Sequence, residues 1–126
     1  MKWLSRALVL SPYCYGLCYS EAEFQKEMRR LKIPREQWPD FILTNAHAST
    51  HFFTTKDGNE AAIICIRRTK RHSKEQVSAL LVHEAVHIWQ YIKESLGENV
   101  PSKEFEAYAI QNLVQNILIA YNTRNR

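Results

Sequence analysis

Residues 83 to 87 read His-Glu-Ala-Val-His, and these residue types at this spacing can activate water on a bound metal ion. On an α-helix, side chains four residues apart lie one turn above each other on the same face, so both imidazoles can reach one ion. Glu84 projects about 100° further around the helix, beside the ion rather than at it. The pattern predicts a zinc site with His83 and His87 as ligands and Glu84 as the general base that takes a proton from water.

The surroundings of this motif favour a metal site over a chance match. Apolar residues occupy most of the circumference of the predicted helix from Ser73 to about Ser95, so the helix should pack on several sides. Two histidines and a glutamate in such a helix are costly to bury unless an ion or hydrogen bonds satisfy them. The competing interpretation is a pair of core histidines that hydrogen bonds alone hold in place.

A catalytic zinc needs a third protein ligand and leaves its fourth position for water. The segment Lys103-Glu-Phe-Glu-Ala-Tyr108, at the start of the last predicted helix, offers two carboxylates. The core stripe of that helix is centred near Ile110, and Glu106 lies closer to the stripe than Glu104 does, so the helical wheel favours Glu106. Residue patterns alone leave both glutamates open as the third ligand.

Motifs in the second half of the chain resemble those of the gluzincin zinc peptidases. They are His83-Glu-Ala-Val-His-Ile-Trp-Gln90, Gly97-Glu98, Pro101-Ser102 and Glu104-Phe-Glu-Ala-Tyr-Ala-Ile-Gln111. The stretch is most similar to the compact minigluzincin-like forms and to uncharacterised metallopeptidases that are frequent in phages and prophages. The similarity covers residues 83 to 111, about a quarter of the chain.

The resemblance implies that Glu104, the first Glu of the family pattern ExxA[DN], is the third zinc ligand, with Glu106 as its rival. It also implies that Tyr108, four residues later, contacts a ligand from one helical turn away. Those families have Asp or Asn at this place, and a phenol can instead donate to a ligand or to the developing oxyanion. Glu84 and Tyr108 are therefore the expected catalytic residues.

Two capping-box sequences mark the helices that must position these groups. Ser20 precedes Glu23 and Ser73 precedes Gln76 at the required spacing, so helices should begin there and run to about Leu31 and Ser95. A last helix should start near Pro101 and carry the glutamate ligand.

Extended segments between the first two helices predict a small sheet. Asp57-Gly58 is a turn signal between the runs 48–55 and 61–67, which we expect to form a hairpin. Phe41–Leu43 is a further candidate for a short strand. The expected fold class is α+β and zincin-like, with the sheet packed on the motif helix.

In gluzincins, a strand before the motif helix forms the edge of the cleft and pairs with the substrate backbone. By that analogy the run from Ala48 to Thr54 is the expected edge, and His51 could donate to substrate. An ordinary exposed strand histidine is the favoured interpretation of His51.

Length and composition predict one domain over residues 1–126. No apolar run approaches the roughly 18 residues of a membrane span, and we expect a folded N-terminal segment in a cytoplasmic protein. The three cysteines, Cys14, Cys18 and Cys65, are expected to be free thiols, with a metal-binding pair at Cys14 and Cys18 as the alternative.

The formal net charge is +4, and its densest cluster runs from Arg67 to Lys74. This cluster is expected to be a solvated connection, with nucleic-acid binding as the alternative. The predicted function is therefore a zinc-dependent metalloendopeptidase acting on a peptide or protein substrate in a phage or prophage context. A zinc-binding domain with a structural or regulatory role, without proteolysis, is the second candidate.

Overall fold

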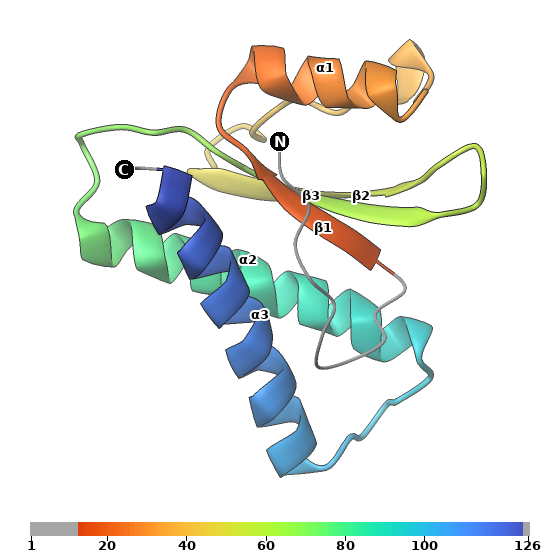
Figure 1. The fold of residues 1–126 in the computed structure, drawn as a ribbon, viewed down its shortest axis with the longest axis vertical. Coiled ribbons are helices and arrows are strands. Elements are labelled where there is room, and N and C mark those ends of the chain that lie inside the picture. Colours follow the sequence, from red (N-terminus) through yellow and green to blue (C-terminus); the bar gives the residue numbers. More distant parts are fainter. Residues whose placement is uncertain (1–12, 125–126) are drawn as a thin grey trace.

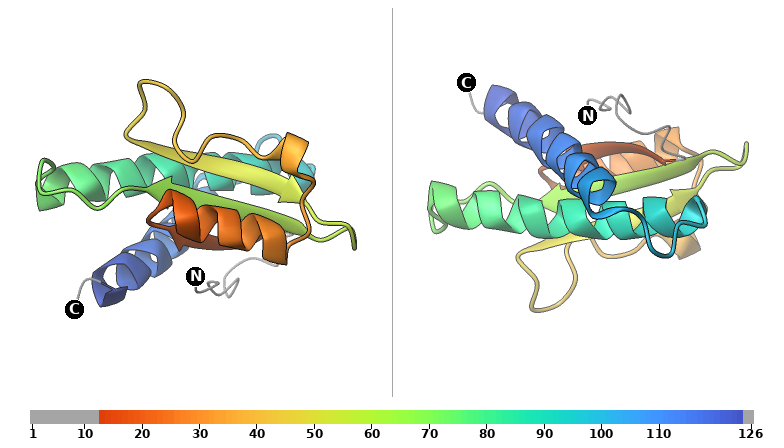
Figure 2. Two further views of the ribbon diagram at one scale, coloured as in Figure 1. Left: turned by 90° about the horizontal axis from the view of Figure 1, so that it is seen from above. Right: turned by 90° about the horizontal axis from the view of Figure 1, so that it is seen from below.

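The computed structural model describes residues 13–124, which form a three-stranded sheet between one helix on one face and two helices on the other (Figures 1 and 2). This arrangement is α+β, as expected. In chain order the elements are β1 (Tyr13–Cys18), α1 (Glu21–Arg30), a 3₁₀ turn (Arg35–Gln37), β2 (Ala48–Thr54), β3 (Glu60–Ile66), α2 (Lys74–Ser95) and α3 (Lys103–Arg124). The expected N-terminal segment, residues 1–10, lies outside the described residues.

The sheet has the order β1-β3-β2, so β3 is central and β2 lies at an edge. β2 and β3 form the predicted antiparallel hairpin, and Gly58 at its turn has the positive φ of 81° that the turn signal implies. β1 pairs with β3 in parallel and was not predicted, because its Tyr-Cys-Tyr-Gly-Leu-Cys sequence has no regular polar alternation.

The prediction of a strand at Phe41–Leu43 is wrong. The backbone N–H of Leu43 donates to the hydroxyl oxygen of Ser49 at 3.0 Å, and the N–H of Ala46 donates to the carbonyl of Leu43 at 3.0 Å. These bonds close a turn that leads into β2, while Phe41 is buried beneath α1. The backbone of this short apolar run is hydrogen-bonded within the turn and not to a strand, but the run still contributes a buried side chain to the core.

Both faces of β3 are covered, and every residue from Ala61 to Ile66 is buried. The layer between the sheet and helices α2 and α3 is the larger of two apolar clusters, and α1 covers the smaller one. Two covered faces explain why β3 reads as a continuous apolar run and not as an alternating one.

Helix α2 begins and ends as predicted. The Ser73 hydroxyl accepts from the N–H of Gln76 at 3.1 Å, and the Gln76 side chain accepts from the N–H of Ser73 at 2.7 Å, which completes a capping box. Gly97, with φ of 72°, ends the helix in the left-handed conformation. α3 then runs back across α2. Both helices lie on the face of the sheet opposite α1 (Figures 1 and 2).

No helix in residues 13–124 combines the length and the apolar character that a membrane crossing requires.

The covered β3 strand gives a stability test. Ile64→Ala, at a fully buried position, should lower the free energy of unfolding by about 2–5 kcal/mol, because it leaves a cavity that the packed layers cannot close. Ile119→Ala on α3 is the matched control, since Ile119 is 56% exposed and its truncation should change stability by no more than about 0.5 kcal/mol. Urea unfolding measures both, and similar losses in the two variants would contradict this assignment of the core.

Candidate metal centre

The two histidines of the motif lie together on the outer side of α2. The Nε2 atoms of His83 and His87 are 3.1 Å apart, and the ring planes stand at 77° to each other. Two nitrogens that each lie about 2.0–2.1 Å from a tetrahedral zinc are separated by about 3.3 Å. The spacing of the imidazoles therefore fits two positions of one such ion.

Gln90 orients the second of these imidazoles. Its side-chain oxygen lies 3.1 Å from Nδ1 of His87, and because an amide oxygen only accepts, the proton of the neutral ring belongs on Nδ1. Nε2 then keeps its lone pair for a metal, and outer hydrogen bonds of this kind fix the tautomer of metal-binding histidines. Sequence reasoning missed this role, although the i+3 spacing from His87 could have indicated it.

Glu84 lies between the imidazole pair and the sheet. It is buried, and the hydroxyl of Thr50 on β2 donates to its Oε2 at 2.8 Å. The carboxylate is thus held on the side of α2 that faces the edge strand, one position around the helix from His83. A carboxylate held there can accept a proton from a water molecule at the imidazole pair.

A groove of about 470 Å³ runs along the edge strand β2. Thr50, the partner of Glu84, lines this groove together with Phe52 and Tyr91, and the last two rings stack with centroids 3.7 Å apart. The groove therefore connects the outer edge of the sheet to the residue that holds the buried carboxylate.

The structure does not bring a third ligand to the imidazole pair. In residues 13–124 no group of three or more His, Cys, Asp and Glu side chains lies close enough to hold a metal ion. Glu106 instead accepts from the indole N–H of Trp89 at 2.8 Å and lies 3.6 Å from Nζ of Lys93. Trp89 projects about 200° around α2 from His87, so this contact is on a different flank of the helix.

Glu104 and Tyr108 lie at the surface at the start of α3. Glu104 is exposed, and Tyr108 is 57% exposed. The helical wheel correctly placed Glu106 nearer the packed side of α3, and that side meets α2 at Trp89. Ala109, Leu113 and Ile117 continue this buried stripe.

The expectation of an exposed His51 is wrong. His51 is buried, its Nε2 lies 3.0 Å from the carbonyl oxygen of Phe41, and its ring packs against Phe24. Alternate residues of a strand face opposite sides, so Thr50 faces α2 while His51 faces α1. His51 therefore holds the turn before β2 and does not face the imidazole pair.

The cysteines lie away from the imidazole pair. Cys14 and Cys18 stand at the two ends of β1, and four residues of strand span about 13 Å, too far for one ion. Cys18 and Cys65 are buried side by side in register on β1 and β3, and burial, with help from nearby Cys18 and acidic groups, raises the pKa of the Cys65 thiol. A thiol kept protonated in this way is a poor ligand and a poor nucleophile.

Part of the basic cluster is held against aromatic rings. The guanidinium of Arg67 lies 5.4 Å from the ring centre of Phe41, and that of Arg68 lies 4.4 Å from the ring centre of Tyr19. Cation–π contacts of this kind fasten the β3–α2 connection to the body of the protein.

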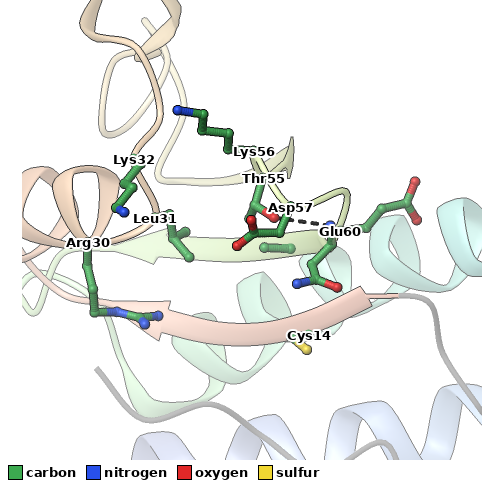
Figure 3. A pocket seen from close by; sticks show the side chains of 10 residues that line it. Cys14, Arg30, Leu31, Lys32, Thr55, Lys56, Asp57 and Glu60 are labelled. Carbon is green, nitrogen blue, oxygen red and sulfur yellow. Dashed lines mark hydrogen bonds between the residues drawn. The ribbon is translucent and has the colours of Figure 1, made fainter.

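A cavity of about 550 Å³ lies beside the hairpin turn, at the other end of β2 from His47 (Figure 3). Basic side chains such as Arg30 and Lys56 line it beside the acidic Asp57 and Glu60. It has no histidine, and its charges of both signs converge on no common point in Figure 3. Its size alone does not make it a functional site.

Comparisons with protein-family models, with curated proteins and with solved structures find no match to this chain. Its function must therefore be argued from the site itself.

The contact between Glu106 and Trp89 predicts a pH-dependent stability. The indole hydrogen bond, with Lys93 nearby, lowers the pKa of Glu106. A carboxyl with a depressed pKa stabilises the folded state above its ordinary pKa of about 4.3, and this contribution is lost as the pH falls through the folded-state value. Glu106→Gln should therefore lower the melting temperature at neutral pH, and the difference from the unmutated chain should shrink in acid.

Both variants are compared with the unmutated chain in metal-free protein. Glu104→Gln is the control for this measurement, because Glu104 is an exposed carboxyl on the same helical turn. Its melting temperature should follow that of the unmutated chain across the whole pH range. Equal pH profiles for the two variants would contradict a stabilising role for the Glu106 carboxylate.

Proposed function

We propose that this protein is a zinc-dependent peptidase in which His83 and His87 hold the metal and Glu84 is the general base. The observation that carries the proposal is the pair of imidazole nitrogens 3.1 Å apart with the Glu84 carboxylate held beside them by Thr50. A direct hydrogen bond between the two rings has the same spacing, so the proposal rests on the pair together with Glu84 and on Gln90, which leaves the Nε2 lone pair of His87 facing His83.

Zinc, when bound, would polarise the scissile carbonyl and lower the pKa of water. Glu84 would accept a proton from the attacking water and pass it to the leaving amine. The Thr50 hydroxyl would keep the carboxylate oriented by donating to Oε2. The other oxygen, Oε1, would then be the one that accepts the proton. No covalent bond between protein and substrate is required.

Glu104 is our proposed third ligand. The carboxylate of Glu106 is already bonded to Trp89 and close to Lys93, and its removal would leave the buried indole N–H without its acceptor. Glu104 is exposed and lies two residues from Glu106, about 200° around α3. The connection before it, residues 96–102, is exposed at every position except Pro101, whereas Phe105 and Glu106 hold the first turn of α3 against Trp89. Ligation by Glu104 therefore requires the start of α3 to move and to break these contacts.

The edge strand β2 is the proposed binding place for the peptide substrate. Its outer edge bears backbone groups that no strand pairs within residues 13–124, and the groove beside it leads to Thr50. An extended peptide could add to this edge through main-chain hydrogen bonds. The scissile bond would then lie near Glu84.

Metal analysis of the purified chain tests the ligand set. The unmutated protein should hold about one zinc per chain, since one closed set of three ligands is proposed. His83→Ala and His87→Ala should abolish zinc uptake, and Glu104→Ala should weaken zinc affinity by more than tenfold. Glu106→Ala is the matched control, and zinc loss in this variant with full uptake by Glu104→Ala would exclude Glu104 as the ligand.

Proteolysis separates the enzyme from a zinc-binding domain with a structural or regulatory role. Glu84→Gln should keep its zinc while losing at least 100-fold in the rate of peptide cleavage, because a general base contributes about 10²–10⁴-fold. Cleavage would be followed on an unstructured protein such as casein, with Glu75→Gln as an exposed control on the same helix. Equal cleavage by both variants would contradict Glu84 as the general base, and no cleavage by the zinc-loaded unmutated chain would favour the structural role.

A further inference from the structure

The connection between β3 and α2, together with the first residue of α2, carries the densest positive charge of the chain. Residues 67–74 contain no acidic residue and five cations, all of them exposed: Arg67, Arg68, Lys70, Arg71 and Lys74. No ion pair within residues 13–124 involves Lys70, Arg71 or Lys74. The proposed peptidase function gives these charges no role, so they call for a separate explanation.

This positive charge is concentrated at one end of the layer formed by α2 and α3. Figure 1 shows the β3–α2 connection and the last turns of α3 at one end of α2, and the α2–α3 connection at the other end. Between Ala61 and His83 the one acidic residue is Glu75, whereas residues 93–106 contain four Glu and two Lys. The 22 residues of α2 span about 33 Å, several times the Debye length of roughly 8–10 Å, so the acidic end does not offset the basic one.

Two aromatic rings hold Arg68 in position. Its guanidinium lies 4.4 Å from the ring centre of Tyr19, next to the end of β1, and 5.5 Å from that of Tyr121 on α3. A guanidinium offers N–H donors in a planar fork that matches two oxygens of a phosphate. Arg67 instead contacts Phe41, in the cluster that α1 covers, so it is directed away from Arg68.

Two further contacts fix the course of the connection. The Thr69 hydroxyl accepts from the backbone N–H of Arg71 at 3.1 Å, and the ring of His72 stands edge-on to that of His47 with centroids 5.0 Å apart. Cations on an anchored loop lose less conformational freedom on binding than cations on a mobile one. The connection is therefore better prepared for a ligand than a solvated linker would be.

The residue types of the connection favour nucleic acid over a membrane or an apolar protein partner. No apolar residue occurs between positions 67 and 74, so nothing there could insert into a lipid surface or form the apolar centre of an interface. Residues 67–73 form neither a helix nor a strand that could enter a groove and read base edges. Contacts with regularly spaced phosphates need only exposed cations.

We propose that Arg68, Lys70, Arg71 and Lys74, which we call the basic surface, bind the sugar–phosphate backbone of nucleic acid without reading its sequence. Arg68 and Arg71 donate to phosphate oxygens, while Lys70 and Lys74 act as point charges. The proposal goes beyond the peptidase function and does not depend on it.

Fluorescence anisotropy with labelled DNA duplexes of about 20 base pairs tests the proposal. Two duplexes of unrelated sequence should bind the full chain with equal affinity at about 50 mM salt. The logarithm of the affinity should fall with the logarithm of the salt concentration with a slope of about −3 to −4, since each of four neutralised phosphates contributes about −0.9. A tenfold preference for one sequence, or a slope near zero, would overturn binding through the backbone.

Removal of three charges locates the surface. Lys70→Gln, Arg71→Gln and Lys74→Gln together should weaken binding at least tenfold and bring the slope to about −1, because one of the four cations remains. Backbone ¹H–¹⁵N signals of residues 67–74 in the unmutated chain should shift when the duplex is added, and those of the hairpin turn, residues 55–59, should not.

The matched control removes the same charge elsewhere. Lys26→Gln, Lys56→Gln and Lys103→Gln together change exposed positions on α1, on the hairpin turn and on α3. Their slope should stay within about 0.5 of that of the unmutated chain, because distant charges are screened. With both triple variants folded by circular dichroism, equal weakening would show attraction by net charge alone and would overturn the proposal.

Arg68→Lys tests the guanidinium that the two rings hold. It keeps the charge but loses the planar fork, so binding should weaken about two- to fivefold at an unchanged slope. Binding as tight as that of the unmutated chain would contradict a role for this guanidinium.

Other polyanions and the metal site complete the test. The duplex should bind at least tenfold more tightly than polyglutamate or vesicles containing phosphatidylserine, and equal or tighter binding of either would overturn the choice of nucleic acid. So would the absence of duplex binding at about 100 µM protein and 50 mM salt, since non-specific binding has dissociation constants of roughly 10⁻⁴–10⁻⁶ M even at physiological salt. His83→Ala should bind the duplex as tightly as the unmutated chain, so failure of the zinc site and failure of the basic surface are distinguishable.

Discussion

The rotation of α2 about its own axis is the constraint on which the rest of this molecule depends. Ala85, Ile88 and Ile92 are buried against the sheet in the same cluster as Ala62 and Ile64. Because each residue advances a helix by about 100°, this packed face fixes the direction of every other side chain on α2. His83 and His87 must then face outward, and Glu84 must face the edge strand.

Local hydrogen bonds satisfy the polar groups that this rotation leaves at the boundary of the core. Thr50 donates to the buried Glu84 carboxylate, and Gln90 accepts from His87. These contacts come from different elements, one from β2 and one from the next turn of α2. They hold Glu84, the proposed general base, and one imidazole in fixed directions, which is the preorganisation that the proposed metal-assisted hydrolysis would require.

Helix α3 contributes mainly to the core. Its stripe of Ala109, Leu113 and Ile117 is buried, and Glu106 extends this stripe by accepting from the indole of Trp89. The Glu106 carboxylate thereby stabilises the crossing of α2 and α3. Glu104, on the same turn, is exposed. The two neighbouring glutamates thus have different surroundings, and the difference arises from the packing of α3.

Much of this architecture was predictable because it depends on local physics. Capping boxes gave the starts of α1 and α2, the Asp-Gly turn gave the hairpin, and helix periodicity placed His83 and His87 on one face with Glu84 beside them. Each of these features is decided by residues that lie within a few positions of one another. The sequence alone therefore determined the candidate site's inner residues.

Only the tertiary structure decided which distant groups meet them. β1 became a strand because β3 offers it a parallel partner, and His51 was buried because the edge strand turns that face toward α1. The contacts of Thr50 with Glu84, of Glu106 with Trp89, and of His47 with His72 join segments that are far apart in the chain. Such contacts depend on how the packed layers are positioned relative to one another, and the residue pattern within one segment does not predict that position.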